Sequence, residues 1–293
     1  MSDLKQDEVA VELRVALDAA GPDHGAAGGA SRSSPRAIVG RLRLGTWLPP
    51  LIAFAVLGVI WELYAHAHPY VIPSIEQIWT SLRENPHMYW ANTLTTLREI
   101  AIGGISGILV AFVLAVIMAE VPIVERAVMP LTVVLMVTPI VAIAPALVVA
   151  FGFGVFPKYL VTAIVVFYPM LINSLAGLRD VDERTLDVFT TLHASRLETF
   201  WRLRLPSSLP FVFAGLRIAF PLAVVGAVVA EIAAAGQQAG LGALIQVAAS
   251  QANLPIIWSS ILLLCVLGVL LISGLAVARS RILWWDNGSS KRT

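Results

Sequence analysis

The stretch 261-ILLLCVLGVLLISGLAVA-278 contains no charged residue and no alternation of apolar and polar side chains. A helix that crosses a bilayer needs about 20 mainly apolar residues. A strand of a membrane barrel needs about 10 residues with strict alternation. Inside lipid, a helix satisfies all of its backbone N–H and C=O groups within one segment. The stretch therefore predicts a membrane-spanning helix.

The rest of the chain is also apolar. Of its 293 residues, 58% are hydrophobic and 13% are charged, whereas soluble domains carry roughly 25% charged residues. Long apolar segments alternate with charged or Pro/Gly-containing breaks, and six of them are expected to span: 48–66, 93–119, 127–151, 158–177, 209–235 and 255–278. We therefore expect an all-α integral membrane protein with six transmembrane helices.

The distribution of Lys and Arg predicts the orientation, because these residues accumulate in short cytoplasmic connections. The side of the membrane that faces away from the termini carries little beyond Arg83 and Lys158. The side that holds both termini carries Arg36, Arg41, Arg43, Arg126, Arg179, Arg184, Arg196, Arg202, Arg204, Arg279, Arg281, Lys291 and Arg292. Both termini of this multi-pass protein are therefore predicted to be cytoplasmic.

The ends of the chain differ from its middle. Residues 1–45 include the Gly/Ala/Ser/Pro-rich run 21-GPDHGAAGGASRSSPR-36, which has no regular apolar period and predicts a disordered cytoplasmic tail. The first 30 residues contain no apolar run of the kind that marks a secretory signal peptide. The expected organisation is this tail, a membrane domain over 46–285 and a short cytoplasmic tail over 286–293.

Several other classes of protein are disfavoured. Cys265 is the only cysteine, so neither a disulfide nor a cysteine metal site is expected. His66 and His68 could hold a metal in principle, but we expect two solvated loop histidines and no metal. A membrane enzyme would need a nucleophile and base, or metal ligands, at membrane depth, and no such spaced set is present. The expected surrounding is a lipid membrane, with no nucleic acid partner.

One predicted cytoplasmic segment, 190-TTLHASRLETFWRLRLP-206, is amphipathic at helical spacing. Ser195 and Glu198 have the spacing of a capping box, which predicts a helix start there, and Pro206 is expected to end the helix. Residues 182–192 predict a preceding short helix with acidic residues in its first turn, so the chain must turn at His193 and Ala194. An interfacial helix on anionic lipid and a helix pair that binds a cytosolic partner both remain open on these grounds.

The same segment resembles the cytoplasmic signature of the inner-membrane permease subunits of binding-protein-dependent ABC importers. That signature is Glu-Ala-Ala, three residues, Gly, nine residues and Ile-x-Leu-Pro. Here the spacing is filled by Asp187-Val188-Phe189, His193 and 203-LRLP-206. The run 192-LHASRLETFWRLRLPSSLPFVFAGLRIAF-220 is similar to the sulfonate, nitrate, taurine and thiamine-precursor branch. So are 70-YVIPSIEQIW-79, 94-LTTLREIAIGG-104, 169-PMLINSLAGLRDVD-182 and 240-GLGALI-245.

The resemblance implies a type I ABC importer permease fold, in an inner membrane, with coupling helices over 180–207. Residues 184–206 would couple to a separate cytosolic ATPase dimer that holds ATP and Mg, and the chain itself would bind no cofactor and be no enzyme. The coupling residues that the resemblance implies are Asp187, Phe189, His193, Ala194, Ser195, Glu198, Phe200, Trp201 and Pro206. It also implies a second permease copy, in a homodimer, and an extracytoplasmic substrate-binding protein. The chain has no G-x-x-x-x-G-K-[ST] phosphate loop of its own.

Two departures from the signature concern the turn and the docking face. The Gly of the signature usually takes a left-handed conformation, and His193 stands in its place. His is one of the non-Gly residues enriched at positive φ, so we expect the turn to persist with some strain. Asp187 keeps the acid of Glu-Ala-Ala, while Val188 and Phe189 are bulkier than the two alanines, which predicts a modified docking surface.

Breaks within spans mark the expected translocation pathway, because freed backbone groups are tolerated at membrane depth where they line a cavity. Candidate breaks are Pro139, Pro145, Pro169 and Pro221, although a lone proline in a span is often only a packing kink. Most charged residues of the spans, such as Glu62, Arg98, Glu99 and Arg217, lie near helix ends, where snorkelling to the interface is expected. The residues predicted to face the pathway are Met136, Thr138, Asn173 and Glu231.

The sequence gives only a weak indication of the transported solute. The clear charges in the middle and outer parts of the spans are acidic, which favours a neutral or cationic small molecule, such as a pyrimidine vitamin precursor, over a sulfonate, nitrate or aromatic acid. In the uncharged outer loop 236–255, Gln237, Gln238 and Gln246 could bind substrate or binding protein, or be plain loop residues. The alternative function is a secondary transporter or channel-like protein without an ATPase, although no matching halves of an inverted repeat are visible.

Overall fold

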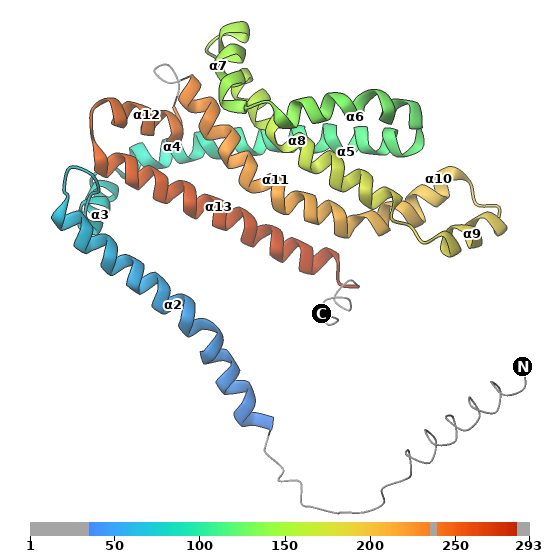
Figure 1. Ribbon diagram of the computed structural model, residues 1–293, viewed down its shortest axis with the longest axis horizontal. Coiled ribbons are helices and arrows are strands. Elements are labelled where there is room, and N and C mark those ends of the chain that lie inside the picture. Colours follow the sequence, from blue (N-terminus) through green and yellow to red (C-terminus); the bar gives the residue numbers. More distant parts are fainter. Residues whose placement is uncertain (1–34, 235–238, 286–293) are drawn as a thin grey trace, which may run out of the picture. The chain divides into compact units, whose positions relative to one another are not determined.

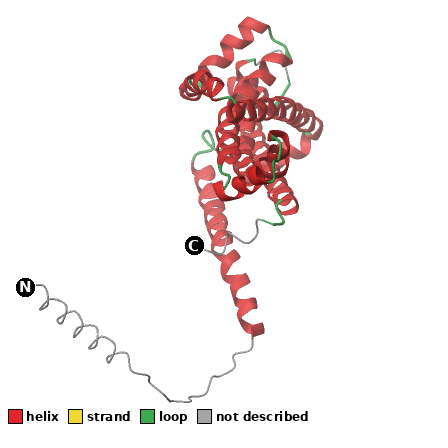
Figure 2. Ribbon diagram, turned by 90° about the vertical axis from the view of Figure 1, so that its right-hand side faces the viewer, coloured by secondary structure: helices red, strands yellow, loops and turns green. Residues whose placement is uncertain are grey.

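The computed structural model describes residues 35–234 and 239–285. Throughout these ranges the regular elements are helices, and they include no strand (Figure 2). The chain divides after Val59 into two compact units. The described part of the first unit belongs to helix α2 (Pro35–Ala67). Residues 35–45, which the sequence analysis assigns to the tail, are therefore helical, whereas 1–34 and the predicted tail 286–293 lie outside the described residues.

The second unit, from Ile60 onward, contains the remaining helices (Figure 1). Two of its segments, η1 and η2, are π-helical turns within longer helices. The elements are α3 (Ile75–Glu84), α4 (Pro86–Glu99), η1 (Ile100–Gly104), α5 (Ile105–Glu120), α6 (Pro122–Val137), α7 (Ile140–Phe151), α8 (Val155–Arg179), α9 (Glu183–Thr191), α10 (Arg196–Thr199), η2 (Phe200–Arg204), α11 (Leu205–Ala233), α12 (Leu241–Ser250) and α13 (Leu254–Ile282).

The expected all-α membrane fold is confirmed. Five helical segments are long and apolar enough to cross a membrane: Leu48–Ala67, Pro86–Glu120, Val155–Arg179, Arg196–Ala233 and Leu254–Ile282. A sixth span is obtained when the pair α6 and α7 is taken as one broken segment. The predicted outer loop 236–255 differs from expectation, because residues 241–250 of it form helix α12.

The third predicted span, 127–151, is not one straight helix. The chain bends by 101° at the break between helices α6 and α7. At the break, Thr138 has the extended backbone conformation φ −77° and ψ 124°, because the ring of the following Pro139 disfavours the helical region for the residue before it. The Thr138 hydroxyl donates to the Val134 carbonyl at 2.6 Å and satisfies a group near the helix end.

The expectation that Pro206 ends a helix is wrong, because the helix runs on as α11 to Ala233. Pro206 lies in the first turn of α11, after the π-helical turn η2. A proline lacks the N–H that an α-helix interior requires. In the π turn the Leu205 N–H donates to the Phe200 carbonyl, and this shift of the hydrogen-bond pattern accommodates the proline without a break.

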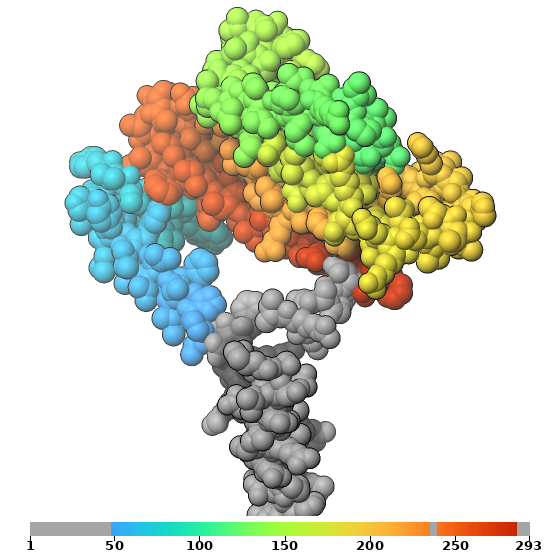
Figure 3. Space-filling model, turned by 45° about the vertical axis from the view of Figure 1, so that its right-hand side comes forward, coloured from blue at the N-terminus to red at the C-terminus, as the bar shows by residue number. Residues whose placement is uncertain are grey.

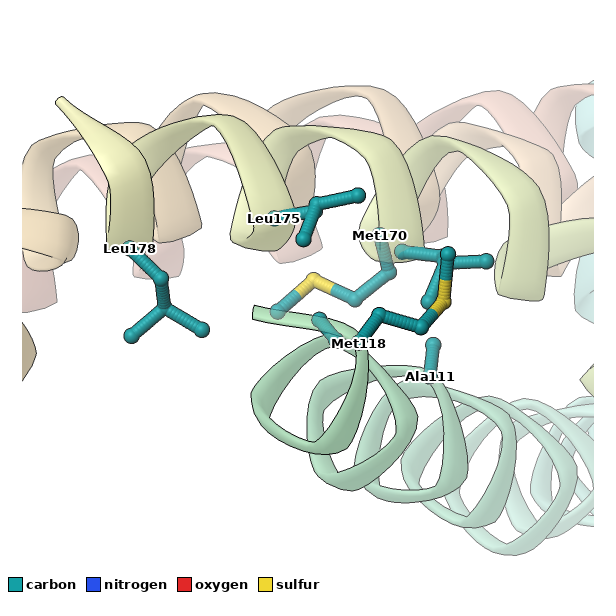
Figure 4. Packing of buried hydrophobic residues seen from close by; sticks show 7 residues of the cluster. Ala111, Met118, Met170, Leu175 and Leu178 are labelled. Carbon is teal, nitrogen blue, oxygen red and sulfur yellow. The ribbon is translucent and has the colours of Figure 1, made fainter. Parts of the chain in front are cut away.

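The core of the second unit forms where α8 packs against α5 and α11. Met118 of α5 and Met170 of α8 lie between the two helices (Figure 4). The helices approach closely because small residues lie between them. A Cβ at Gly107 would lie 2.5 Å from the Ala163 carbonyl oxygen, and one at Gly103 would lie 2.7 Å from the Tyr159 carbonyl oxygen. Close packing therefore holds η1 and α5 against α8.

Helices α9 and α10 lie at one end of the second unit, and α3 and α12 lie at its other end (Figures 1 and 3). Helix α11 joins the two ends, since it follows η2 directly and runs to Ala233 without a break. The two ends of the unit are therefore connected by one continuous helix. Each end carries a distinct group of polar and apolar side chains.

Candidate functional site

The predicted turn between the two short helices is confirmed at α9 and α10. His193 has φ 54°, the left-handed conformation expected where the signature has Gly. The Ala194 N–H donates to the Phe189 carbonyl and the His193 N–H donates to the Thr190 carbonyl, both at 3.0 Å. These two bonds are those of a Schellman motif, which satisfies the last carbonyls of a helix. Phe189 and Ala194 thus belong to the turn itself.

The predicted capping box is also confirmed. The Glu198 N–H donates to the Ser195 hydroxyl oxygen at 3.2 Å, and the Ser195 N–H donates to the Glu198 carboxylate at 3.0 Å. These bonds satisfy two of the free amides at the start of α10. The chain from Glu183 to Arg204 is therefore a helical hairpin with both sides of its turn fixed. We call it the coupling segment after the role that the resemblance implies.

Two ion pairs tie the end of α8 to the start of α6 and the coupling segment to the end of α5. The Arg179 Nη1 lies 2.6 Å from a Glu125 carboxylate oxygen, and the Arg204 Nη1 lies 2.6 Å from a Glu120 oxygen. The partners are 54 and 84 residues apart in the sequence. From the sequence, both arginines serve only as markers of orientation. No local pattern indicated their partners.

The coupling segment exposes several large apolar side chains among its charged ones. Four large apolar side chains are more than half exposed: Val188 (54%), Leu192 (72%), Leu197 (67%) and Trp201 (60%). Asp187 is exposed on the same segment. Phe200, in contrast, is half-buried and packs against the cluster that contains Met118 and Leu178. Of the two aromatic residues that the resemblance implies for coupling, Phe200 therefore lies inward and Trp201 outward.

A pocket of about 560 Å³ lies where the broken span meets α8 and α11. Three of the four predicted pathway residues, Met136, Thr138 and Asn173, line it. None of its lining residues is charged; the others are Leu135, Pro139, Ile140, Ile164, Val165, Tyr168, Pro169, Ile172, Ile218 and Leu222. The Asn173 amide donates to the Pro169 carbonyl at 2.7 Å.

Glu231, the fourth predicted pathway residue, does not line this pocket. It is fully buried, and its carboxylate accepts hydrogen bonds from the Thr96 hydroxyl at 2.6 Å and the Gly242 N–H at 2.5 Å. The predicted snorkelling of Glu99 is wrong as well. Glu99 is buried and pairs with the buried Lys158 ammonium group at 3.0 Å. The signal available in the sequence was the position of these charges within apolar spans.

The remaining outer-loop expectations concern the glutamines. Gln246 is exposed on α12, whereas Gln237 and Gln238 lie outside the described residues.

A bundle of spanning helices, with a fixed helical hairpin at one end and an uncharged pocket beside a broken span, defines a multi-pass membrane protein of the transporter class.

Comparison with known proteins identifies the family. The model of the binding-protein-dependent transport system inner membrane component matches residues 107–282, which is more than half of the chain. The chain is 34% identical over 241 residues to the formylaminopyrimidine transport permease of Halalkalibacterium halodurans, covering 81% of this chain and 96% of that protein. It is 30% identical over 239 residues to the riboflavin transport permease of Chloroflexus aurantiacus, covering 78% and 86% of the two chains.

A third relative is the taurine transport permease of Escherichia coli, which is 27% identical over 196 residues, covering 67% of this chain and 70% of that protein. The chain belongs to the family of binding-protein-dependent transport system inner membrane components, which are ABC transporter permeases. In this family an ATPase and a substrate-binding protein are the general partners. The family is one of noncatalytic membrane subunits.

Proposed function

We propose that this chain is the membrane-spanning subunit of an ATP-driven importer and that residues 184–206 couple it to a separate cytosolic ATPase. The observation that carries the proposal is the coupling segment. Its turn and its second helix are fixed by local hydrogen bonds, and its outward face exposes Leu192, Leu197 and Trp201. Exposed apolar patches on a rigid element are typical of protein interaction sites. A rigid hairpin can transmit a displacement, whereas a flexible loop cannot.

The route of transmission that we propose runs through Phe200. Its ring packs against the cluster of Met118 and Leu178, so a movement of the coupling segment would push directly on α5 and α8. The Arg204–Glu120 pair supports the same route at the end of α5. Trp201 would contact the ATPase, and Asp187 would pair with a basic residue there. Ser195, Glu198 and His193 would keep the shape of the hairpin, and Pro206 would lie at the start of the transmitting helix.

The proposed assembly contains two copies of this chain, an ATPase dimer that holds ATP and Mg, and an extracytoplasmic binding protein. The chain would bind no cofactor directly. Its location would be the cytoplasmic (inner) membrane with both termini cytoplasmic. The proposed organisation keeps a cytoplasmic tail at residues 1–45, the permease domain at 46–285 and a short tail at 286–293.

The proposed pathway includes the pocket lined by Met136, Thr138 and Asn173. The pocket offers apolar surface, the Tyr168 ring and a few neutral polar groups, but no charge. A sulfonate, nitrate or carboxylate would enter such a pocket without a compensating cation, at a large desolvation cost. A neutral heteroaromatic molecule fits its chemistry better. Formylaminopyrimidine and riboflavin, which appear in the names of two relatives, are of this kind.

The test compares two exposed tryptophans at opposite ends of the second unit, Trp201 (60% exposed) and Trp90 (69% exposed). The chain is purified with its ATPase in lipid nanodiscs, and affinity for the ATPase and ATP turnover are measured. Trp201→Ala should weaken ATPase binding at least tenfold, as expected for a buried aromatic anchor at an interface. Trp90→Ala, the matched control, should leave ATPase binding unchanged.

The alternative is a secondary transporter or channel that works without an ATPase. It predicts that the chain, reconstituted alone, moves solute without ATP and that Trp201→Ala has no more effect than Trp90→Ala. Either result would overturn the importer proposal. Mass spectrometry of the molecule held by the copurified binding protein would then test the substrate class. A bound anion without an aromatic ring would contradict the neutral heteroaromatic class.

A further inference from the structure

Four consecutive residues that lead into α12 are held by side chains from three other helices. The Lys158 ammonium donates to the Ala239 carbonyl at 3.1 Å, and the Gly240 N–H donates to the Asn92 amide oxygen at 2.7 Å. The Leu241 N–H donates to the Thr96 hydroxyl oxygen at 2.9 Å, and the Gly242 N–H donates to Glu231 at 2.5 Å. The donors and acceptors come from α4, α8 and α11.

These contacts replace an ordinary N-cap. Gly240 is the N-cap residue of α12 and makes no side-chain cap, yet the first amides of a helix need acceptors. Here Asn92, Thr96 and Glu231 supply them, and the Glu231 carboxyl group lies at the positive end of the helix dipole. Glycine is required for this approach. A Cβ at Gly240 would lie 2.1 Å from a Glu231 carboxylate oxygen, and the φ of Gly240 is 141°.

The charges around this segment do not balance if both carboxyl groups are ionised. Glu99, Glu231 and Lys158 are all buried to 99% or more. Two carboxylates and one ammonium group would leave a net negative charge inside the bundle, which is costly. Helix α12 carries no charged residue, and Arg98, the neighbour of Glu99 on α4, is exposed. Within the described residues, no further charged side chain of α4, α8, α11 or α12 is buried.

One buried oxygen of the cluster indicates how the charge is balanced. The Glu99 Oε1 accepts from Lys158, whereas the buried Oε2 has no hydrogen-bond partner as a carboxylate oxygen. The carboxyl groups of Glu99 and Glu231 lie in contact with each other. Two carboxylates at one site do not both ionise. Both oxygens of Glu231 already accept hydrogen bonds, so the free Oε2 of Glu99 is the place for a proton.

We propose that Glu99 is protonated and donates a hydrogen bond to an ionised Glu231, so that Glu99, Glu231 and Lys158 form an electroneutral latch on the N-terminus of α12. This inference rests on the proposed function for its consequence in transport, because α11 carries Glu231 near one end and follows the coupling segment directly at the other. Glu99, Glu231, Lys158, Thr96 and Asn92 are positioning residues. They fix α12 and do not contact the uncharged pocket.

The direct test is infrared difference spectroscopy on the purified chain in nanodiscs, which needs neither ATPase nor substrate. The wild type should show the carbonyl stretch of a protonated carboxylic acid, with slow deuterium exchange because the group is buried. Glu99→Gln should remove this band. If the wild type shows no such band, or if the band survives in Glu99→Gln, the proposal is overturned. A wild type without the band but with an alkali ion bound in the cluster would overturn it equally.

The two glutamine variants separate the proton from the latch. In Glu99→Gln the amide oxygen can still accept from Lys158 and the NH₂ can donate to Glu231, so the variant imitates the protonated acid. In Glu231→Gln an NH₂ group replaces one of the two carboxylate oxygens, so either the Thr96 hydroxyl or the Gly242 N–H loses its acceptor. The position of α12 is then measured by the alkylation rate of Ala248→Cys, a buried site on α12, in a Cys265→Ser background.

Alkylation should rise about tenfold in Glu231→Gln, as expected when one buried hydrogen-bond partner is lost, and should stay within about twofold of the parent rate in Glu99→Gln, because its hydrogen bonds are preserved. Equal rises in both variants would contradict a proton on Glu99. Because infrared absorption and alkylation are measured without ATP, the latch can fail while the importer function holds. The importer function can likewise fail in the Trp201 test while the latch holds.

Discussion

The two ends of the second unit handle charge and apolar surface in opposite ways. At the coupling segment, the ion pairs Arg179–Glu125 and Arg204–Glu120 are partly exposed, with side-chain exposures between 23% and 44%, and large apolar side chains point outward. At the latch, Glu99, Lys158 and Glu231 are sealed inside the bundle. Exposed pairs contribute little to stability, whereas a broken buried pair is costly.

This difference indicates a division of roles. The coupling segment keeps weak internal links and an exposed apolar face, which suits a surface that a partner covers. The polar groups of the latch bond to one another and to residues 239–242, which suits an element that must stay in place. The variants below test this comparison, beginning with the largest expected effect.

The largest effect is expected for Lys158→Met at the latch. Removing the ammonium group leaves the Glu99 and Glu231 carboxyl groups buried without a cation and removes a bond to the Ala239 carbonyl. Loss of one partner of a buried pair costs about 3 to 5 kcal/mol. The free energy of unfolding in mixed micelles, measured by denaturant titration, should fall by this amount.

The double variant Lys158→Met with Glu231→Gln is the control for Lys158→Met. It removes the buried cation together with the buried anion, and so it should recover part of the stability that Lys158→Met loses. A double variant that is no more stable than Lys158→Met would contradict the inference that the latch is a buried, charge-balanced cluster. A single variant as stable as the wild type would contradict it equally.

A smaller effect is expected at the turn of the coupling segment. His193→Val places a β-branched residue at φ 54°, a conformation that costs ordinary residues roughly 1 to 2 kcal/mol and that β-branched residues tolerate worst. Hydrogen exchange at the Ala194 N–H, which bonds to the Phe189 carbonyl, should become faster by about tenfold. His193→Gly should leave the exchange unchanged or slower, since glycine adopts this conformation freely. Faster exchange in the glycine variant would mean that the His193 side chain itself holds the turn.

The smallest effect is expected for the pair Arg204–Glu120. A double-mutant cycle with Arg204→Ala and Glu120→Ala should give a coupling energy of about 0.2 to 1 kcal/mol, because both side chains are partly exposed. High salt should reduce it further. The measurement is the free energy of unfolding of the four variants. A coupling as large as the loss in Lys158→Met would show that the two ends are built alike.

Much of the coupling segment could be predicted because its determinants are local. The spacing of Ser195 and Glu198 predicted the capping box, and the match of His193 to a signature glycine predicted the left-handed turn. The proline error has a physical cause. The π turn that accommodates Pro206 lies within an otherwise continuous helix, and no residue type in 200-FWRLR-204 signals it.

The pocket was partly predictable for the same reason. Thr138 and Pro139 break the third span through their own backbone preferences, so two of its edges could be located from the sequence. Whether Glu231 belonged to it could not be decided, because an acid near the end of a span can snorkel, line a cavity or be buried. Its hydrogen bond to Thr96 joins residues 135 apart in the sequence.

The sequence by itself determined that this is a helical membrane protein, approximately where its spans lie and that a capped helical hairpin interrupts them. These properties depend on hydropathy and on contacts between residues a few positions apart, which every segment carries in its own residues. Only the tertiary structure decided that Lys158, Glu99 and Glu231 meet around residues 239–242, and that Phe200 packs inward while Trp201 stays outward. Those contacts depend on how helices distant in sequence pack, and buried charges find partners only once the packing exists.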